Sequence, residues 1–114
     1  MSIKLVEIID GSAGLLTASA VTYCTILANE ATTVTKMTFT NTGAATTITG
    51  YKIPSGETAA NQYKFIDAHP IGANETWSCP DIEGQVLIAG SFIQLLAADA
   101  ARVAVVASGI NVVQ

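Results

Sequence analysis

Among the residues that could carry chemistry, the chain has a single histidine, His69, which precedes Pro70 in a stretch rich in turn-forming residues. A catalytic histidine needs a nucleophile beside it and an acid that orients it. Asp67 and Ser78 are the nearby residues in sequence that could serve. A metal site would need three or four ligands, with histidine and cysteine leading, and the chain has one histidine and two distant cysteines. We therefore interpret His69 as a residue in a break between strands and expect no catalytic, cofactor or metal site.

Four acids also lie close together in sequence: Asp67, Glu75, Asp81 and Glu83. A glycosidase would need two carboxylates flanking a sugar cleft, and a calcium loop would need several oxygens converging from one segment. The run 75–83 has neither the EF-hand pattern nor its glycines, and no P-loop, GxGxxG or GxSxG motif occurs in the chain. We interpret the four acids as solvated loop residues and predict that the chain is not an enzyme.

The two cysteines, Cys24 and Cys79, are too few for a disulfide framework and form no CxxC pair. A disulfide bridge between Cys24 and Cys79 is geometrically possible, but nothing in the sequence supports it. The interpretation that the sequence favours is two small, half-buried apolar side chains.

Candidate interface residues come from the aromatic side chains and from the apolar C-terminal end. Exposed aromatic rings on a β-sandwich can stack on sugars or anchor a protein interface. Trp77 stands beside a turn and is the best candidate for an exposed ring, with Tyr51 and Tyr63 as companions. Ile110 and Val112 belong to an apolar end that, like residues 3–9, could add a strand to a neighbour's sheet.

The charge content points to assembly with other proteins. Half of the 114 residues are hydrophobic and only 12% are charged, about half the usual charged share of roughly 25%. Some surface is therefore expected to meet copies of the chain or another protein. The net charge is -4, and the five basic residues are spread singly. Nucleic acids and anionic membranes need clustered basic residues, which excludes both as partners.

The N-terminal segment contains Ala18-Ser19-Ala20, which resembles a signal-peptidase site. Glu7 and Asp10, however, fall where a signal peptide needs an uninterrupted apolar region. The uncharged stretch 11–29 alternates apolar and polar residues, so it is not a membrane span. We expect the protein to be soluble and to be made in the cytoplasm without a secretion signal.

Short runs of Thr, Val, Ile and Ala, broken about every ten residues by Gly, Asn, Pro and Ser, predict a series of β-strands. The predicted strands are 3–9, 20–28, 32–41, 46–53, 62–68, 76–79, 84–88, 91–97 and 102–107, with 110–113 extending or following the last. A helix over 97–107 is the alternative on composition, but Val103, Val105 and Val106 favour a strand.

The clearest alternation lies in 32–41, where Met37 and Phe39 share one face while the polar Lys36, Thr38 and Thr40 share the other. This pattern is typical of a sheet with one wet side. The turn 41–43 predicts that 46–53 pairs back as a hairpin partner. We predict one all-β domain over residues 1–114, an antiparallel β-sandwich of about eight strands, with jelly-roll and immunoglobulin-like strand orders both open.

Much of the chain resembles a family of small tailed-bacteriophage virion proteins. The matching segments are 37–42 (MTFTNT), 45–49 (ATTIT), 51–56 (YKIPSG), 71–76 (IGANET), 84–90 (GQVLIAG) and 105–110 (VVASGI). The resemblance spans about two-thirds of the chain, from the first of these segments to the last, and the matching segments consist of turns and core positions. The chain departs from the pattern at Ser91, where the family more often has an acid.

The resemblance implies a structural part of a virion that decorates the capsid or belongs to the neck, tail or fibre apparatus. Its implied partners are copies of itself and major capsid or tail proteins. No catalytic residue carries over, because the pattern contains none. The alternative function is a receptor- or glycan-binding module of a tail fibre or spike, which would depend on Trp77, Tyr51 and Tyr63.

Overall fold

The computed structural model describes all residues, 1–114, as nine β-strands and one short 3-10 helix. The elements are β1 (Ser2–Ile9), β2 (Val21–Thr25), β3 (Glu30–Asn41), β4 (Thr46–Ile53), η1 (Asn61–Tyr63), β5 (Lys64–Ile71), β6 (Thr76–Ser78), β7 (Val86–Ile88), β8 (Phe92–Ala97) and β9 (Val103–Val113). No helix in the chain is both long and apolar enough to cross a membrane.

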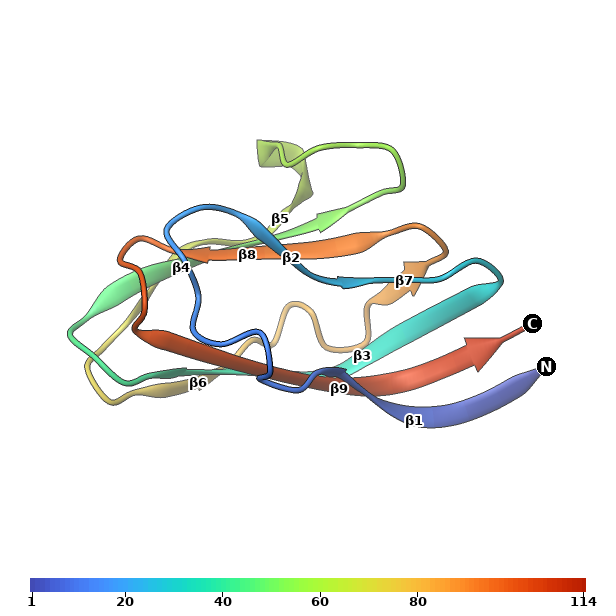
Figure 1. Ribbon diagram of the computed structural model, residues 1–114, viewed down its shortest axis with the longest axis horizontal. Coiled ribbons are helices and arrows are strands. Elements are labelled where there is room, and N and C mark those ends of the chain that lie inside the picture. Colours follow the sequence, from blue (N-terminus) through green and yellow to red (C-terminus); the bar gives the residue numbers. More distant parts are fainter.

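The strands form two antiparallel sheets. Sheet A has the order β1-β9-β3-β6, and β7 also pairs with β3; sheet B has the order β2-β8-β4-β5. The sheets pack face to face, and both termini lie at the same end because β1 pairs with β9 (Figure 1). The predicted all-β fold and its antiparallel β-sandwich architecture are confirmed.

The core lies between the sheets and is built by the alternation along each strand. On β3, Met37 and Phe39 are fully buried, while the polar Lys36, Thr38 and Thr40 that alternate with them are exposed or partly exposed, as predicted. On β8, Ile93 and Leu95 are fully buried and alternate with partly exposed residues. Eighteen buried residues form one continuous core cluster. This burial gives the chain its main source of stability.

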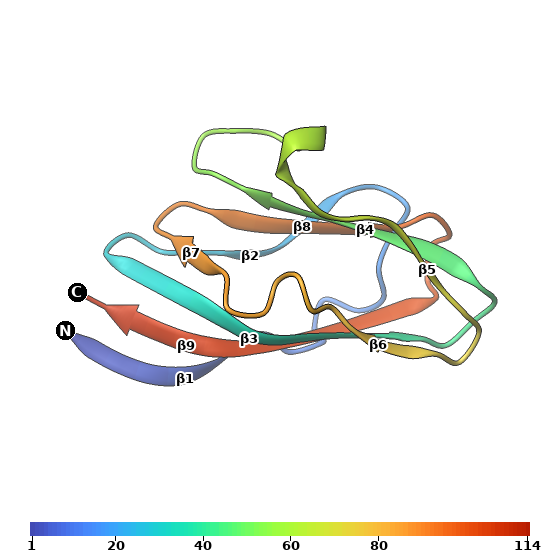
Figure 2. The same ribbon diagram turned by 180° about the vertical axis from the view of Figure 1, so that it is seen from behind.

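The outer sides of the two sheets differ. The segment between β4 and β5, which contains η1, lies over the outer side of sheet B (Figure 1). Seen from behind, the outer side of sheet A carries no covering segment (Figure 2). Sheet A therefore presents its outward side chains directly to the surroundings.

The predicted hairpin between 32–41 and 46–53 is wrong. β3 belongs to sheet A and β4 to sheet B, where β4 pairs with β5 and β8. The turn after Asn41 therefore crosses from one sheet to the other. Asn41 stabilises this crossing because its buried amide donates hydrogen bonds to the carbonyls of Ala44, Ile71 and Gly72, at 2.9, 3.2 and 3.1 Å.

The placement of His69 in a break between strands is also wrong. β5 continues through His69 and Pro70 to Ile71. Pro70 is tolerated because β5 is an edge strand, whose outer side has no partner that needs its N–H. The irregularity predicted near this point takes the form of a shift in the β4–β5 register, with Ala68 at a positive φ of 48°.

The C-terminal end forms one long strand. β9 runs without interruption from Val103 to Val113, so residues 110–113 extend the preceding strand and the helical alternative over 97–107 is wrong. The expectation that 110–113 could add a strand to a neighbour's sheet is wrong as well. β9 has β1 on one side and β3 on the other, which leaves it no free edge.

Candidate interaction surface

The structure places His69 in an aromatic stack. The ring of His69 on β5 lies parallel to that of Trp77 on β6, with centroids 3.7 Å apart, and Trp77 also stacks on Phe39 at 5.8 Å. Both His69 and Trp77 are half-buried. Because β5 ends sheet B and β6 lies at the edge of sheet A, the stack closes one flank of the sandwich.

The side chains that could have assisted His69 are engaged with other groups. Asp67 forms an ion pair with Lys64 at 3.0 Å. The hydroxyl of Ser78 lies 3.3 Å from that of Thr38 on the neighbouring strand. The structure therefore does not bring a nucleophile, a base and an orienting acid together at His69.

The remaining acids do not converge either. Glu75 accepts a hydrogen bond from the backbone N–H of Gly72 at 2.6 Å and so fixes the turn before β6. Asp81 and Glu83 are exposed. No group of three or more His, Cys, Asp or Glu side chains is arranged to hold a metal ion.

The two cysteines are free thiols, so the bridge left open by the sequence does not form. Cys24 is half-buried, as predicted, whereas Cys79 is fully buried in the core. Burial raises the pKa of the Cys24 thiol from 9.0 to about 11, and burial also raises the pKa of Cys79. A thiol that stays protonated at neutral pH is a poor nucleophile.

These raised pKa values predict a loss of stability in alkali. Unfolded thiols ionise near pH 9 while the folded ones stay protonated, so the free energy of unfolding should be constant below about pH 8 and fall as pH rises toward 11. We expect Cys24 to contribute about 2 kcal/mol of this loss, measured by urea unfolding across the pH range. A Cys24→Ser variant should show a smaller loss, and equal slopes in the two proteins would contradict the assignment.

The three aromatic residues proposed for an interface do not form one surface. Tyr63 donates a hydrogen bond from its hydroxyl to Glu57 at 3.0 Å, within the segment that covers sheet B. Tyr51 lies on β4, next to Lys64 across the β4–β5 pairing. Both tyrosines are half-buried and are associated with sheet B, whereas Trp77 belongs to sheet A. The expectation of an exposed Trp77 ring is wrong because Phe39 and His69 pack against it.

The most exposed apolar surface lies on the outer side of sheet A, at the end where the termini meet. We call it the apolar platform. Its side chains form two rows across four strands, set by the strand register: Ile3, Val112, Ala31 and Ile88 in the first row, and Leu5, Ile110, Thr33 and Val86 in the second. Directly opposite residues in an antiparallel pair share a face. On β9, β3 and β7 the residues between the rows are Asn111, Thr32 and Leu87, and all three are buried. The platform therefore faces outward.

The platform is both large and free of charge. Ile3, Leu5 and Ile88 are 64%, 84% and 65% exposed, while Ile110 and Val112 at its centre are half-buried between their neighbours. These two central members, Ile110 and Val112, are among the residues that the sequence proposed for an interface. The sequence missed Val86 and Ile88, whose membership depends on the pairing of β7 with β3. The uninterrupted apolar run of β7 was the only local signal.

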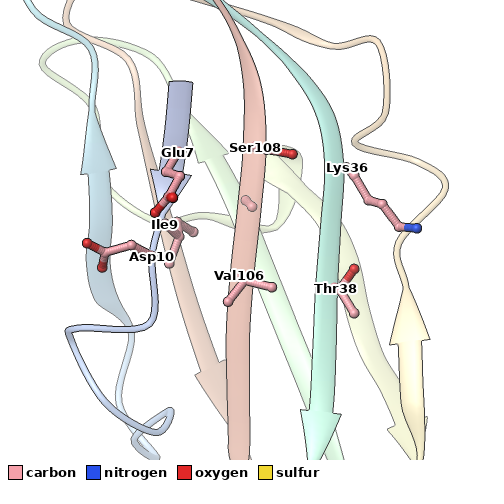
Figure 3. Close-up of a pocket in the computed structure, with 8 residues that line it drawn as sticks. Glu7, Ile9, Asp10, Lys36, Thr38, Val106 and Ser108 are labelled. Atoms are coloured by element: carbon pink, nitrogen blue, oxygen red, sulfur yellow. The ribbon is translucent and has the colours of Figure 1, made fainter. Parts of the chain in front are cut away.

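A charged row borders the platform. Glu7 on β1 and Lys36 on β3 lie on either side of Ser108 on β9, in register with it. Figure 3 shows Glu7 and Asp10 on one side of β9 and Lys36 on the other, with the amine of Lys36 directed away from Glu7.

Together these side chains surround a shallow hollow of about 320 Å³. The two ion pairs of the chain, Lys64–Asp67 and Arg102–Asp99, include none of the charged residues around the hollow. Glu7 and Lys36 are therefore charged side chains without a partner of opposite sign.

A scan against protein-family models and searches of curated proteins and of solved structures return no match.

Proposed function

We propose that the chain is a non-enzymatic structural protein of a tailed-bacteriophage virion. In this proposal it acts by self-association and by docking on the particle, as a capsid decoration or cement protein or as an accessory component of the neck or tail. The observation that carries the proposal is the exposed, uncharged apolar platform on sheet A.

The platform supports assembly for a physical reason. Soluble monomers rarely expose a contiguous group of large apolar side chains unless the group binds something. Burying such a surface releases water from apolar groups and requires no charge to lose its hydration. On a virion, many copies present the same weak contact at once, which multiplies it into firm attachment.

Two further features favour a structural role over catalysis or glycan recognition. The side chains that could carry chemistry are dispersed, since Asp67 and Ser78 bond to partners other than His69. Recognition of a glycan by Trp77 would need a free ring face, and this ring packs against Phe39 and His69. The sequence resemblance to virion proteins is the reason for placing this assembly on a virus particle.

A binding experiment with particles tests the proposal. Virions assembled without the chain should bind the purified protein saturably, at a copy number set by the symmetry of the capsid or tail, and cryo-electron microscopy should locate it. Quantitative mass spectrometry of complete virions should give the same copy number. Absence of the chain from complete virions, together with no binding to depleted ones, would contradict the proposal.

A further inference from the structure

The outer side of sheet A has a pattern that matches itself under a twofold rotation. Both rows of the platform are uncharged, and β9 runs through the middle of the three strands that carry most of it. The next row places an acid, Glu7, one strand to one side of β9 and a base, Lys36, one strand to the other. If a copy of this face is laid on it about a twofold axis along the central strand, the acid of each copy lies opposite the base of the other.

We propose that this face binds a second copy of the chain about a twofold axis that runs along β9. Such an axis places β1 of one copy over β3 of the other and β9 over β9. Glu7 of each copy then faces Lys36 of its partner, which forms two ion pairs from four unpaired charges. The inference rests on the proposed assembly function and specifies the partner and the contact.

The sizes of the platform side chains fit the same axis. Ile3 and Leu5 on β1 are large and project far into solvent. The residues in the same rows on β3 are the small Ala31 and Thr33. Since β1 lies over the partner's β3 in this arrangement, each large side chain meets a small one. Two sheets packed in this way lie about 10 Å apart with roughly aligned strands, a gap that glutamate and lysine side chains can bridge.

The other twofold axis for a face-to-face contact fits less well. An axis that runs across the strands, between the two rows, also superposes apolar side chains on apolar side chains. It leaves Glu7 and Lys36 opposite the other end of the sheet, where the nearest residues include Met1 and Asn29, whose side chains are uncharged. The side-chain charges therefore favour the axis along β9.

The contact is expected to be of moderate strength. An axis along β9 opposes only β1, β9 and β3 of the two copies and leaves β7 outside the contact. The interface is therefore at the lower end of the size range for specific interfaces, where complexes are weak or transient. We therefore expect a monomer–dimer equilibrium with a micromolar dissociation constant, measured by sedimentation equilibrium. The two ion pairs lie at the border of the contact, so the dissociation constant should rise with salt concentration.

Two substitutions of the same chemistry separate the platform from other exposed apolar residues. Leu5→Lys should weaken the dimer by at least about tenfold, because it places an ammonium group in the apolar contact. Leu27→Lys is the matched control, since Leu27 is 65% exposed, lies in the β2–β3 turn and is outside the platform. It should leave the dissociation constant unchanged. Leu5 is 84% exposed, so neither substitution should prevent folding, which circular dichroism checks.

A charge exchange tests the axis itself. Glu7→Lys alone and Lys36→Glu alone should each weaken the dimer, because each places like charges opposite one another. The double variant, Glu7→Lys with Lys36→Glu, should restore dimerisation to near the wild-type value. Failure of the double variant to recover would overturn the axis along β9.

The outcomes also separate this inference from the proposed function. A wild-type chain that stays monomeric at high micromolar concentration overturns the dimer, even if it binds depleted virions. Loss of virion binding in Leu5→Lys with a monomeric wild type would show that the particle occupies the platform instead. A dimer with the expected variant behaviour that binds no virion would support the inference and count against the virion role.

Discussion

Replacement of Gly109 with alanine is expected to lower the free energy of unfolding by about 3 kcal/mol, the upper part of the usual range for overpacking. Gly109 lies in β9 and is buried between β1 and β3, opposite Val6 and Val34. A Cβ atom at this position would overlap the carbonyl oxygen of Thr33 and would lie 2.7 Å from the Cδ1 atom of Ile8.

The Thr33 carbonyl cannot move aside easily. It belongs to the backbone of β3, immediately before the bulge between Val34 and Lys36, and β3 pairs with β9 on one side and β7 on the other. Relief of the overlap would require a shift of the strand and loss of its pairing, whereas a clash with a flexible side chain would need only a rotamer change. The expected loss in the free energy of unfolding therefore comes from displacement of the main chain of β3.

Gly72→Ala is the matched control. Gly72 has no positive φ, and a Cβ atom there would have only one close neighbour, the Glu75 Oε1 atom at 3.3 Å. Glu75 is exposed and can adjust, so we expect a loss below about 1 kcal/mol. Urea unfolding of both variants provides the comparison. Equal losses in the two would contradict the close approach of β9 to β3.

The parts of the fold that follow from local pattern could be predicted from the sequence. The alternation around Met37 and Phe39 identified the buried side of β3, and the alternation around Ile93 identified that of β8. A side-chain period of two residues is a property of each strand by itself. The spacing of turn residues likewise predicted a sandwich, because each turn limits the length of the strand before it.

The pairing of the strands could not be predicted in the same way. The turn after Asn41 looked like a hairpin turn, but β3 and β4 belong to different sheets. A short connection permits either a hairpin or a crossing between sheets, and the choice depends on contacts with strands distant in sequence. For β3 these are β9, β6 and β7, whose register with it no local pattern encodes.

The candidate interaction surface also has one part that local sequence pattern predicts and another that depends on strand pairing. Ile110 and Val112 could be proposed as interface residues because the C-terminal segment of the sequence is apolar. The rows that join them to Ile3, Leu5 and Val86 exist only because of the register of three strand pairs. Trp77 was misjudged for the converse reason, since its burial depends on His69 from the opposite sheet.

Replacement of Asn41 with alanine is expected to cost about 3 kcal/mol in the free energy of unfolding. Asn41 is fully buried at the crossing between the sheets. Its amide nitrogen donates to three carbonyls, and its Oδ1 atom accepts a hydrogen bond from the backbone N–H of Gly43 at 2.9 Å. Each buried polar group left without a partner costs about 1 to 3 kcal/mol, and alanine replaces none of these bonds.

A matched control and an isosteric variant distinguish this network from a simple loss of volume. Asn61→Ala removes an exposed asparagine and should cost less than about 0.5 kcal/mol. Asn41→Asp keeps the acceptor for Gly43 but directs a carboxylate at the carbonyls of Ala44, Ile71 and Gly72. Burial and those carbonyls should raise the pKa of this carboxyl in the folded state.

The Asn41→Asp variant should therefore become more stable as pH falls. Its folded pKa lies above the unfolded value of about 3.9, so the stability that the protonated form contributes is fully present below that value and is lost as pH rises through the folded pKa. The protonated carboxyl can again donate to a carbonyl, which the carboxylate cannot. Urea unfolding of this variant from acidic to neutral pH should thus show decreasing stability relative to the wild type. A constant difference between the two proteins would mean that the donor side of Asn41 does not hold the two sheets together.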